Sequence, residues 1–201
     1  TTLLASAAVG PTIIPSSAFG AAGSPPPSER ITVGLIGRGL MGSGHLRVLL
    51  GRKDAQVLAV CDVDRSRCEQ GRRLADETYA AERTSGAYRG CAAYNDYREL
   101  IARPDIDAVV IVTPDHWHAL ASCDAAAAGK DVYCEKPVSL TIDEGCKIVE
   151  AVCRNGRVFQ TGTQYRSIPT IRQVCEFVRR GGLGRVKQVF TVWGKTHVPQ
   201  L

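Results

Sequence analysis

The chain has 201 residues, of which 44% are apolar, 22% charged and 6% aromatic. This apolar fraction can fill a core, so disorder is excluded for the bulk of the chain, and no apolar run approaches the roughly 20 residues of a membrane-spanning helix. The formal net charge is +5, from 25 basic and 20 acidic residues. The basic residues are scattered along the chain, which favours an ordinary solvated surface over nucleic-acid binding.

The first thirty residues are expected to be separate from the folded body. Residues 1–23 carry no charge and are rich in small and aliphatic residues, and three prolines follow at 25–27. An uncharged stretch with small residues at 17–21 is typical of an export signal and its cleavage zone. We therefore interpret residues 1–30 as a signal remnant and linker, and expect a periplasmic or exported protein that uses the twin-arginine route for cofactor-loaded proteins. The alternatives are a disordered tail and a cytoplasmic location.

The body of the chain alternates short apolar strands with helical patterns. In chain order we expect strands at 31–36, 56–61, 108–112, 131–134 and 158–161, and helices at 40–50, 66–81, 97–102, 116–128 and 142–154. Asp64 is placed to act as the N-cap of the second helix. The alternation implies parallel strand pairing, and therefore a doubly wound α/β fold of Rossmann type.

Eight cysteines could suggest a disulfide framework, but their spacing argues against one. They form no CxxC pair and no cluster with histidine at metal-ligand spacing, so we expect no metal site. Several lie in apolar runs, such as Cys61 and Cys134, where a thiol behaves as a small buried hydrophobic group. We therefore expect most of the cysteines to be reduced core residues.

The turn between the first strand and the first helix reads Gly37-Arg38-Gly39-Leu40-Met41-Gly42, a GxGxxG pattern. The three glycines permit, in order, a tight turn, close approach of the backbone to a pyrophosphate, and close packing of helix on strand. Asp62 ends the second strand, where a carboxylate accepts hydrogen bonds from the adenosine ribose and repels a 2′-phosphate. The pattern thus predicts NAD rather than NADP, although Arg65 and Arg67 keep NADP open, and Asp62 could instead be a loop cap.

Two further segments follow strands at the same carboxyl edge, where ligands bind in such sheets. One is Thr113-Pro114-Asp115-His116-Trp117-His118 and the other is Glu135-Lys136-Pro137. Together with CDVD at 61–64, TGTQYR at 161–166 and GGLGRV at 181–186, their order and spacing resemble the Gfo/Idh/MocA oxidoreductase family from residue 31 to about residue 190.

The resemblance implies that Lys136 is catalytic and lies beside the nicotinamide and the substrate. Its amine could hydrogen-bond a sugar hydroxyl and help remove the proton while hydride leaves the same carbon. The alternative is a surface lysine paired with Glu135. Arg166 is expected on the substrate side, and His116 and His118 are expected in the cleft or as one cleft residue and one helix-cap residue. The predicted cofactor contacts are Gly37, Gly39, Leu40, Met41, Gly42, Asp62, Thr113, Pro114, His116, His118, Glu135 and Gln164.

The predicted domains are residues 31–165, which bind the dinucleotide, and residues 166–201, a connecting helix and the start of a second domain with a strand at 186–193. In the family the second domain is a large open antiparallel sheet that supplies the substrate pocket and the surface for homo-oligomer formation. About 15 residues cannot form such a sheet. We therefore expect a truncated chain, which by itself binds nucleotide and turns over nothing.

The sequence predicts an NAD-dependent oxidoreductase acting on a sugar, cyclitol or related polyol. One alternative is a glycoside hydrolase of the same fold that holds NAD tightly and uses it in an oxidation–elimination cycle. Another is a non-catalytic nucleotide-binding module. All three hypotheses use the same nucleotide-binding residues. They differ in the reaction that the protein catalyses and not in the cofactor that it binds.

Overall fold

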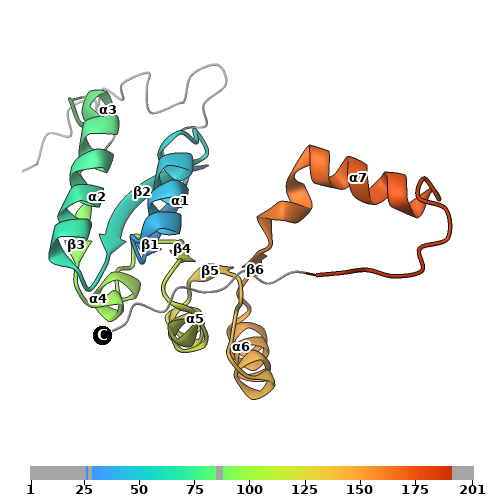
Figure 1. Ribbon diagram of the computed structural model, residues 1–201. Helices are drawn as coiled ribbons and strands as arrows, with labels where there is room; N and C mark the ends of the chain where they lie inside the picture. The colour runs from blue at the N-terminus through green and yellow to red at the C-terminus, as the bar shows by residue number, and fades with distance from the viewer. Residues whose placement is uncertain (1–25, 27–28, 85–87, 192–201) are drawn as a thin grey trace, which may run out of the picture. The chain divides into compact units, whose positions relative to one another are not determined.

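The structure is a computed structural model that describes residue 26 and residues 29–84 and 88–191 (Figure 1). The predicted export signal therefore lies outside the described residues, apart from Pro26 and the two residues before the first strand. The chain divides into two compact units, one ending at Gly162 and one beginning at Thr163. Each unit is described by itself below.

The first unit is built on a six-stranded sheet in which every neighbouring pair is parallel. The spatial order is β3-β2-β1-β4-β5-β6, so the chain reverses its direction of winding between β1 and β4. This order confirms the doubly wound Rossmann-type fold. The strands are β1 (Ile31–Ile36), β2 (Ala55–Cys61), β3 (Ala92–Tyr94), β4 (Ala108–Ile111), β5 (Asp131–Glu135) and β6 (Phe159–Gly162).

Helices cover both faces of the sheet, and the core is accordingly divided in two. The helices of this unit are α1 (Leu40–Leu50), α2 (Arg65–Thr78), α3 (Ala80–Thr84), α4 (Tyr97–Ile101), the 3-10 turn η3 (Asp115–Trp117), α5 (His118–Ala127) and α6 (Ile142–Asn155). In Figure 1, α1 and α2 lie on one side of the sheet and α4 and α5 on the other. Side chains alternate along the strands, so that Val110 belongs to the first core cluster and Val109 and Ile111 to the second.

The predicted strands agree with the observed ones to within a residue or so, but two features differ. The helix expected at 66–81 is broken into α2 and α3 at Tyr79. Tyr79 is 5% exposed, and its hydroxyl accepts a hydrogen bond of 3.3 Å from the backbone N–H of Val57. Tyr79 is therefore held in the core, and the helix is interrupted at this residue. The strand β3 has only three half-buried residues, too few for an alternating pattern to be recognised.

Helix ends follow the expected local chemistry. The side chain of Asp64 accepts hydrogen bonds from the backbone N–H groups of Ser66 and Arg67, which confirms it as the N-cap of α2. At the start of α6, Thr141 and Glu144 form a capping box, in which each side chain accepts a backbone N–H of the other's residue. These caps fix the residues at which α2 and α6 begin, after the loops that follow β2 and β5.

The eight cysteines are free, but they are not all core residues. Cys61, Cys68, Cys91 and Cys134 are buried. Burial, the largest effect, raises the pKa of Cys61 to about 12, and it raises that of Cys134 to about 11, so both stay thiols at neutral pH. The expectation of burial is wrong for three cysteines on the outer faces of helices, which are exposed: Cys146, Cys153 and Cys175.

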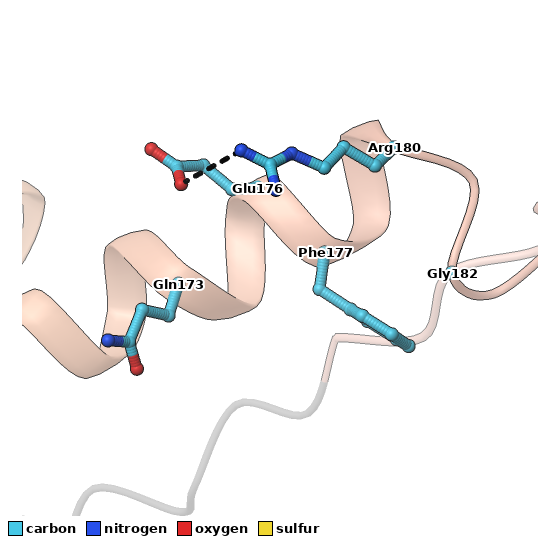
Figure 2. A pocket seen from close by; sticks show the side chains of 5 residues that line it. All are labelled: Gln173, Glu176, Phe177, Arg180 and Gly182. Atoms are coloured by element: carbon cyan, nitrogen blue, oxygen red, sulfur yellow. Dashed lines mark ion pairs between the residues drawn. The ribbon is translucent and has the colours of Figure 1, made fainter.

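The second unit contains the 3-10 turn η4 (Gln164–Ser167) and the helix α7 (Pro169–Arg179). Figure 2 shows a shallow hollow beside α7, where Phe177 points toward the turn at Gly182 while Glu176 and Arg180 form an ion pair of 3.9 Å. The strand expected at 186–193 is not formed over residues 186–191. A strand needs a hydrogen-bonded neighbour, and the described part of this unit provides none. Residues 192 and 193 lie outside the described residues.

Within residues 29–84 and 88–191, no helix has the length and apolar character needed to cross a membrane.

Candidate functional site

The carboxyl ends of β1, β2, β4 and β5 meet around one cleft with a volume of about 790 Å³. This is the edge of the sheet, beside the reversal between β1 and β4, where ligands bind in doubly wound folds. The cleft brings together most of the predicted site residues, namely Gly37, Gly39, Leu40, Met41, Asp62, Thr113, Pro114, His118, Glu135 and Lys136. Gly42 and His116 are not among its lining residues, and Gln164 and Arg166 lie in η4 of the second unit.

The loop after β1 has the geometry that its glycines predict. Gly37 has a φ of +91°, and a Cβ there would lie 2.6 Å from the carbonyl oxygen of Val112. A Cβ on Gly42 would overlap the carbonyl oxygen of Gly37, whereas a Cβ on Gly39 would meet nothing within 4 Å. Gly37 and Gly42 are therefore needed for the tight turn and the close packing, and the backbone at Gly39 is open to an approaching ligand.

The amino terminus of α1 opens onto this loop without a side-chain cap. Gly39 occupies the N-cap position, and within the described residues this helix end has no side-chain cap hydrogen bond. The backbone N–H groups of that turn and the helix dipole together form a binding site for an anion. A pyrophosphate held there would supply the acceptors that the residue at the N-cap lacks, so this end of the cleft fits a dinucleotide.

Asp62 is 8% exposed, and its carboxylate is already used by the protein backbone. Oδ2 accepts the N–H of Arg38 at 2.6 Å, and Oδ1 accepts the N–H of Asp64 at 2.9 Å. Asp62 therefore braces the glycine loop against the end of β2. Each carboxylate oxygen can accept more than one hydrogen bond, so this does not prevent contact with a ribose. Arg65 and Arg67 were the two residues that left NADP possible as the cofactor. Arg67 lines the cleft and Arg65 does not.

Thr113 provides an independent indication of a ligand. It follows β4 and lines the cleft, and its Oγ1 is buried without a hydrogen-bond partner in the described part of the chain. A buried hydroxyl without a partner is costly, unless a bound molecule supplies one. Together with the open glycine loop, this atom indicates that the cleft fits a bound nucleotide.

The segment Glu135–Pro137 begins at the end of β5 and lines the cleft on the side away from β2. Glu135 is 4% exposed, and its Oε2 accepts the backbone N–H of Lys136 at 3.1 Å. The peptide bond between Lys136 and Pro137 is cis. The side chain of Lys136 is exposed and lines the cleft. The buried carboxylate thus holds the backbone while the amine remains accessible to a ligand.

The two histidines of the segment after β4 have different positions. His118 is 2% exposed, and its Nδ1 lies 2.6 Å from the carbonyl oxygen of Pro137 and its Nε2 lies 2.8 Å from that of Thr113. It therefore ties the loop after β4 to the loop after β5, with both ring nitrogens directed at backbone atoms. His116 is exposed, with Nδ1 3.8 Å from the carboxylate of Asp115.

Sequence reasoning missed two sets of residues at this site. His45 on α1 contacts Glu135, with 2.7 Å between Nε2 and Oε1, although 90 positions separate them in the chain. No motif marks His45, because the contact depends on how α1 packs beside β5. Four cleft residues come from the loop and helix after β3, a strand that was not predicted: Asn95, Asp96, Tyr97 and Arg98.

Comparison with known proteins identifies relatives that match most of this chain. The uncharacterized oxidoreductase YrbE of Bacillus subtilis is 32% identical over 157 residues, which cover 78% of this chain and 42% of the relative. The inositol 2-dehydrogenase of Salmonella typhimurium is also 32% identical over 157 residues, or 77% of this chain and 43% of the relative. The chain thus spans less than half the length of these relatives.

Solved structures with the same fold include related dehydrogenases. The myo-inositol 2-dehydrogenase from Lactobacillus plantarum superimposes with a TM-score of 0.64 at 26% identity, covering 78% of this chain and 43% of the other. An NAD binding oxidoreductase from Klebsiella pneumoniae gives a TM-score of 0.59 at 29% identity, covering 77% and 40%. The family described as "Oxidoreductase family, NAD-binding Rossmann fold" matches residues 31–163. The chain therefore belongs to the Gfo/Idh/MocA oxidoreductase family and contains its NAD-binding Rossmann domain.

Proposed function

We propose that this protein is an NAD-dependent oxidoreductase that transfers hydride between the nicotinamide and a sugar, cyclitol or related polyol. The observation that carries the proposal is that one cleft combines the glycine loop, Asp62 and Lys136. The relatives named inositol 2-dehydrogenase, at 32% identity, favour a polyhydroxylated substrate. A homo-oligomer remains a prediction of the resemblance.

The chain's own residues divide the work between binding and proton transfer. The loop at Gly37–Gly42 and the amino terminus of α1 would bind the pyrophosphate, and Asp62 would bind the adenosine ribose. NAD supplies the hydride acceptor when it is bound. The amine of Lys136 would orient a substrate hydroxyl and take its proton at Nζ. Its exposure within the cleft supports this role, because a proton-transfer group has to reach the substrate.

Preference for NAD is part of the proposal. Asp62 lies in the cleft with an acidic side chain, and a carboxylate at the ribose position repels a 2′-phosphate. Arg67 also lines the cleft, but it lies 3.5 Å from the Asp64 carboxylate, which offsets its charge. We therefore expect Asp62 to dominate the recognition of the adenosine end.

The test has a binding measurement and a turnover measurement on the full-length protein. Calorimetric titration with NAD and NADP should show tighter binding of NAD, and NADH should form when NAD is mixed with members of a panel of inositols, sugars and polyols. Tighter binding of NADP would contradict the role given to Asp62 and point to Arg65 or Arg67. Release of nitrophenol from a nitrophenyl glycoside without net NADH would identify the hydrolase instead, and nucleotide binding without either reaction would identify a non-catalytic module.

A further inference from the structure

His45 connects two parts of the cleft that no sequence motif joins. It lies on α1, three positions after the last glycine of the loop, and its Nε2 is 2.7 Å from Oε1 of Glu135 at the end of β5. The imidazole also packs against Tyr133, with 5.5 Å between the ring centroids and an angle of 59° between the planes. The ring is thus held from one side while it contacts the carboxylate with its nitrogen.

The burial of Glu135 gives this contact its importance. The side chain of Glu135 is 6% exposed, whereas that of His45 is 21% exposed. A buried carboxylate is costly unless its oxygens accept hydrogen bonds. Because an ionised carboxylate only accepts, the contact requires a hydrogen on Nε2 of His45. His45 therefore supplies a donor to one oxygen of Glu135, while the other accepts the backbone N–H of Lys136.

The same carboxylate also orients the backbone of the Glu135–Pro137 segment, which carries Lys136. The segment is anchored after Lys136 by the contact between His118 and the carbonyl oxygen of Pro137, and before it by the strand β5. Between these anchors, the backbone at Lys136 is oriented by the hydrogen bond that its N–H donates to the Glu135 carboxylate. If the Glu135 side chain changes rotamer, the backbone of Lys136 loses that acceptor.

We propose that His45 is a positioning residue, which holds Glu135 and through it places Lys136 and the nicotinamide end of the cofactor. The effect of His45 on turnover rests on the proposed function, but its effect on NAD affinity rests only on nucleotide binding. His45 is not among the residues that line the cleft, so we expect it to act through Glu135.

The experiment compares three variants of the full-length protein. His45→Leu removes the donor, His45→Gln keeps an N–H donor that can reach Glu135, and Arg47→Leu changes an exposed side chain of the same helix as a control. Each variant is titrated with NAD and with ADP, which lacks the nicotinamide and its ribose, and its kinetic constants are measured with the substrate found in the panel.

His45→Leu should weaken NAD binding about tenfold, because the Glu135 side chain is no longer held beforehand and has to be ordered when the nicotinamide end binds, while ADP binding stays within about twofold. Its kcat should fall about 100-fold, because small displacements of a reacting group have effects of that size. His45→Gln should restore most of both, and Arg47→Leu should match the unaltered protein.

Three results would overturn the inference. NAD and ADP binding that weaken equally would mean that His45 only supports the helix and the glycine loop. Unchanged NAD affinity in His45→Leu would mean that Glu135 is placed without it, and a glutamine variant as impaired as the leucine variant would exclude the donor role. Failure of the proposed function can be distinguished from these results. In that case the unaltered protein would oxidise no polyol, whereas the titrations with NAD and ADP would still test the role of His45.

Discussion

Two buried carboxylates, one directly after β2 and one at the end of β5, each brace one loop of the cleft. Asp62 accepts the N–H of Arg38 in the glycine loop, and Glu135 accepts the N–H of Lys136. Both side chains are buried, so each depends on the hydrogen bonds that it accepts to offset its burial. The loops are consequently ordered by the same groups that line the cleft, which limits the reorganisation needed on binding.

Replacement of Lys136 tests whether binding and chemistry are separate. Lys136→Ala should leave the dissociation constant for NAD within a few-fold, because we propose that the glycine loop and Asp62, which line the same cleft, hold the other end of the cofactor. The rate of substrate oxidation should fall by about 10²–10⁴-fold, the usual loss for a positioned proton-transfer group. Titration calorimetry and steady-state assays of the full-length protein measure the two quantities.

Lys136→Arg is the matched control for charge. A guanidinium stays protonated and cannot accept the hydroxyl proton, so this variant should not recover the activity. Near-normal turnover by Lys136→Ala would instead mean that the lysine is a structural residue. A large loss of NAD affinity in this variant would mean that Lys136 or its loop is needed to bind the cofactor.

At the scale of elements, α1 connects the glycine loop with the end of β5. Its amino terminus begins in the glycine loop, Leu46 and Leu50 bury its inner face against the sheet, and His45 reaches across to β5. One helix thus connects the proposed pyrophosphate site with the strand that leads to Lys136. A change in how α1 approaches the sheet should affect both ends of the cofactor.

Two glycines of α1 give a paired test of this packing. A Cβ on Gly42 would overlap the carbonyl oxygen of Gly37, whereas Gly44 is exposed and a Cβ there would meet nothing within 4 Å. Gly42→Ala should therefore destabilise the protein by about 1–3 kcal/mol and weaken NAD binding. Gly44→Ala should stabilise it by up to about 1 kcal/mol, because alanine is the better helix former, without changing affinity.

Thermal unfolding followed by calorimetric titration distinguishes the two variants. Equal effects of the two substitutions would show that helix propensity, and not contact with the loop, sets the requirement at position 42.

At the scale of the whole molecule, the parallel sheet explains why residues from distant parts of the chain share one cleft. Parallel strands end at the same edge, and the reversal of strand order between β1 and β4 separates the loops there. The two core clusters on opposite faces hold this edge in place. The second unit presents apolar residues of α7 at its surface, among them Val174 and Phe177.

Export is a prediction about the whole molecule and lies outside the described residues. Residues 1–23 are uncharged, and we propose that they derive from a twin-arginine signal. A reporter fused to the intact amino terminus of the full-length protein should be recovered outside the cytosol. A reporter that stays in the cytosol with the intact terminus would remove the export proposal.

The fold and the binding edge were predictable from the sequence, since both follow from local patterns. A β-branched run such as Ala108–Val112 specifies a buried strand whatever lies elsewhere, and glycines in GxGxxG specify the backbone of their own turn. Asp64 is an N-cap because of its neighbours two and three positions on. The break of the second helix at Tyr79 escaped prediction because burial of that side chain decided it. The strand at 92–94 escaped because three half-buried residues are too few for a recognisable pattern.

The sequence by itself therefore determined most of the elements, their parallel pairing and the residue types at the carboxyl edge. Only the tertiary structure decided what those side chains do to one another. Arg38 donates to Asp62 across 24 positions, His45 contacts Glu135 across 90, and His118 contacts a carbonyl oxygen 19 positions away. Local periodicity contains no information about such pairs, because they form only after helices and strands pack and burial obliges each polar group to find a partner.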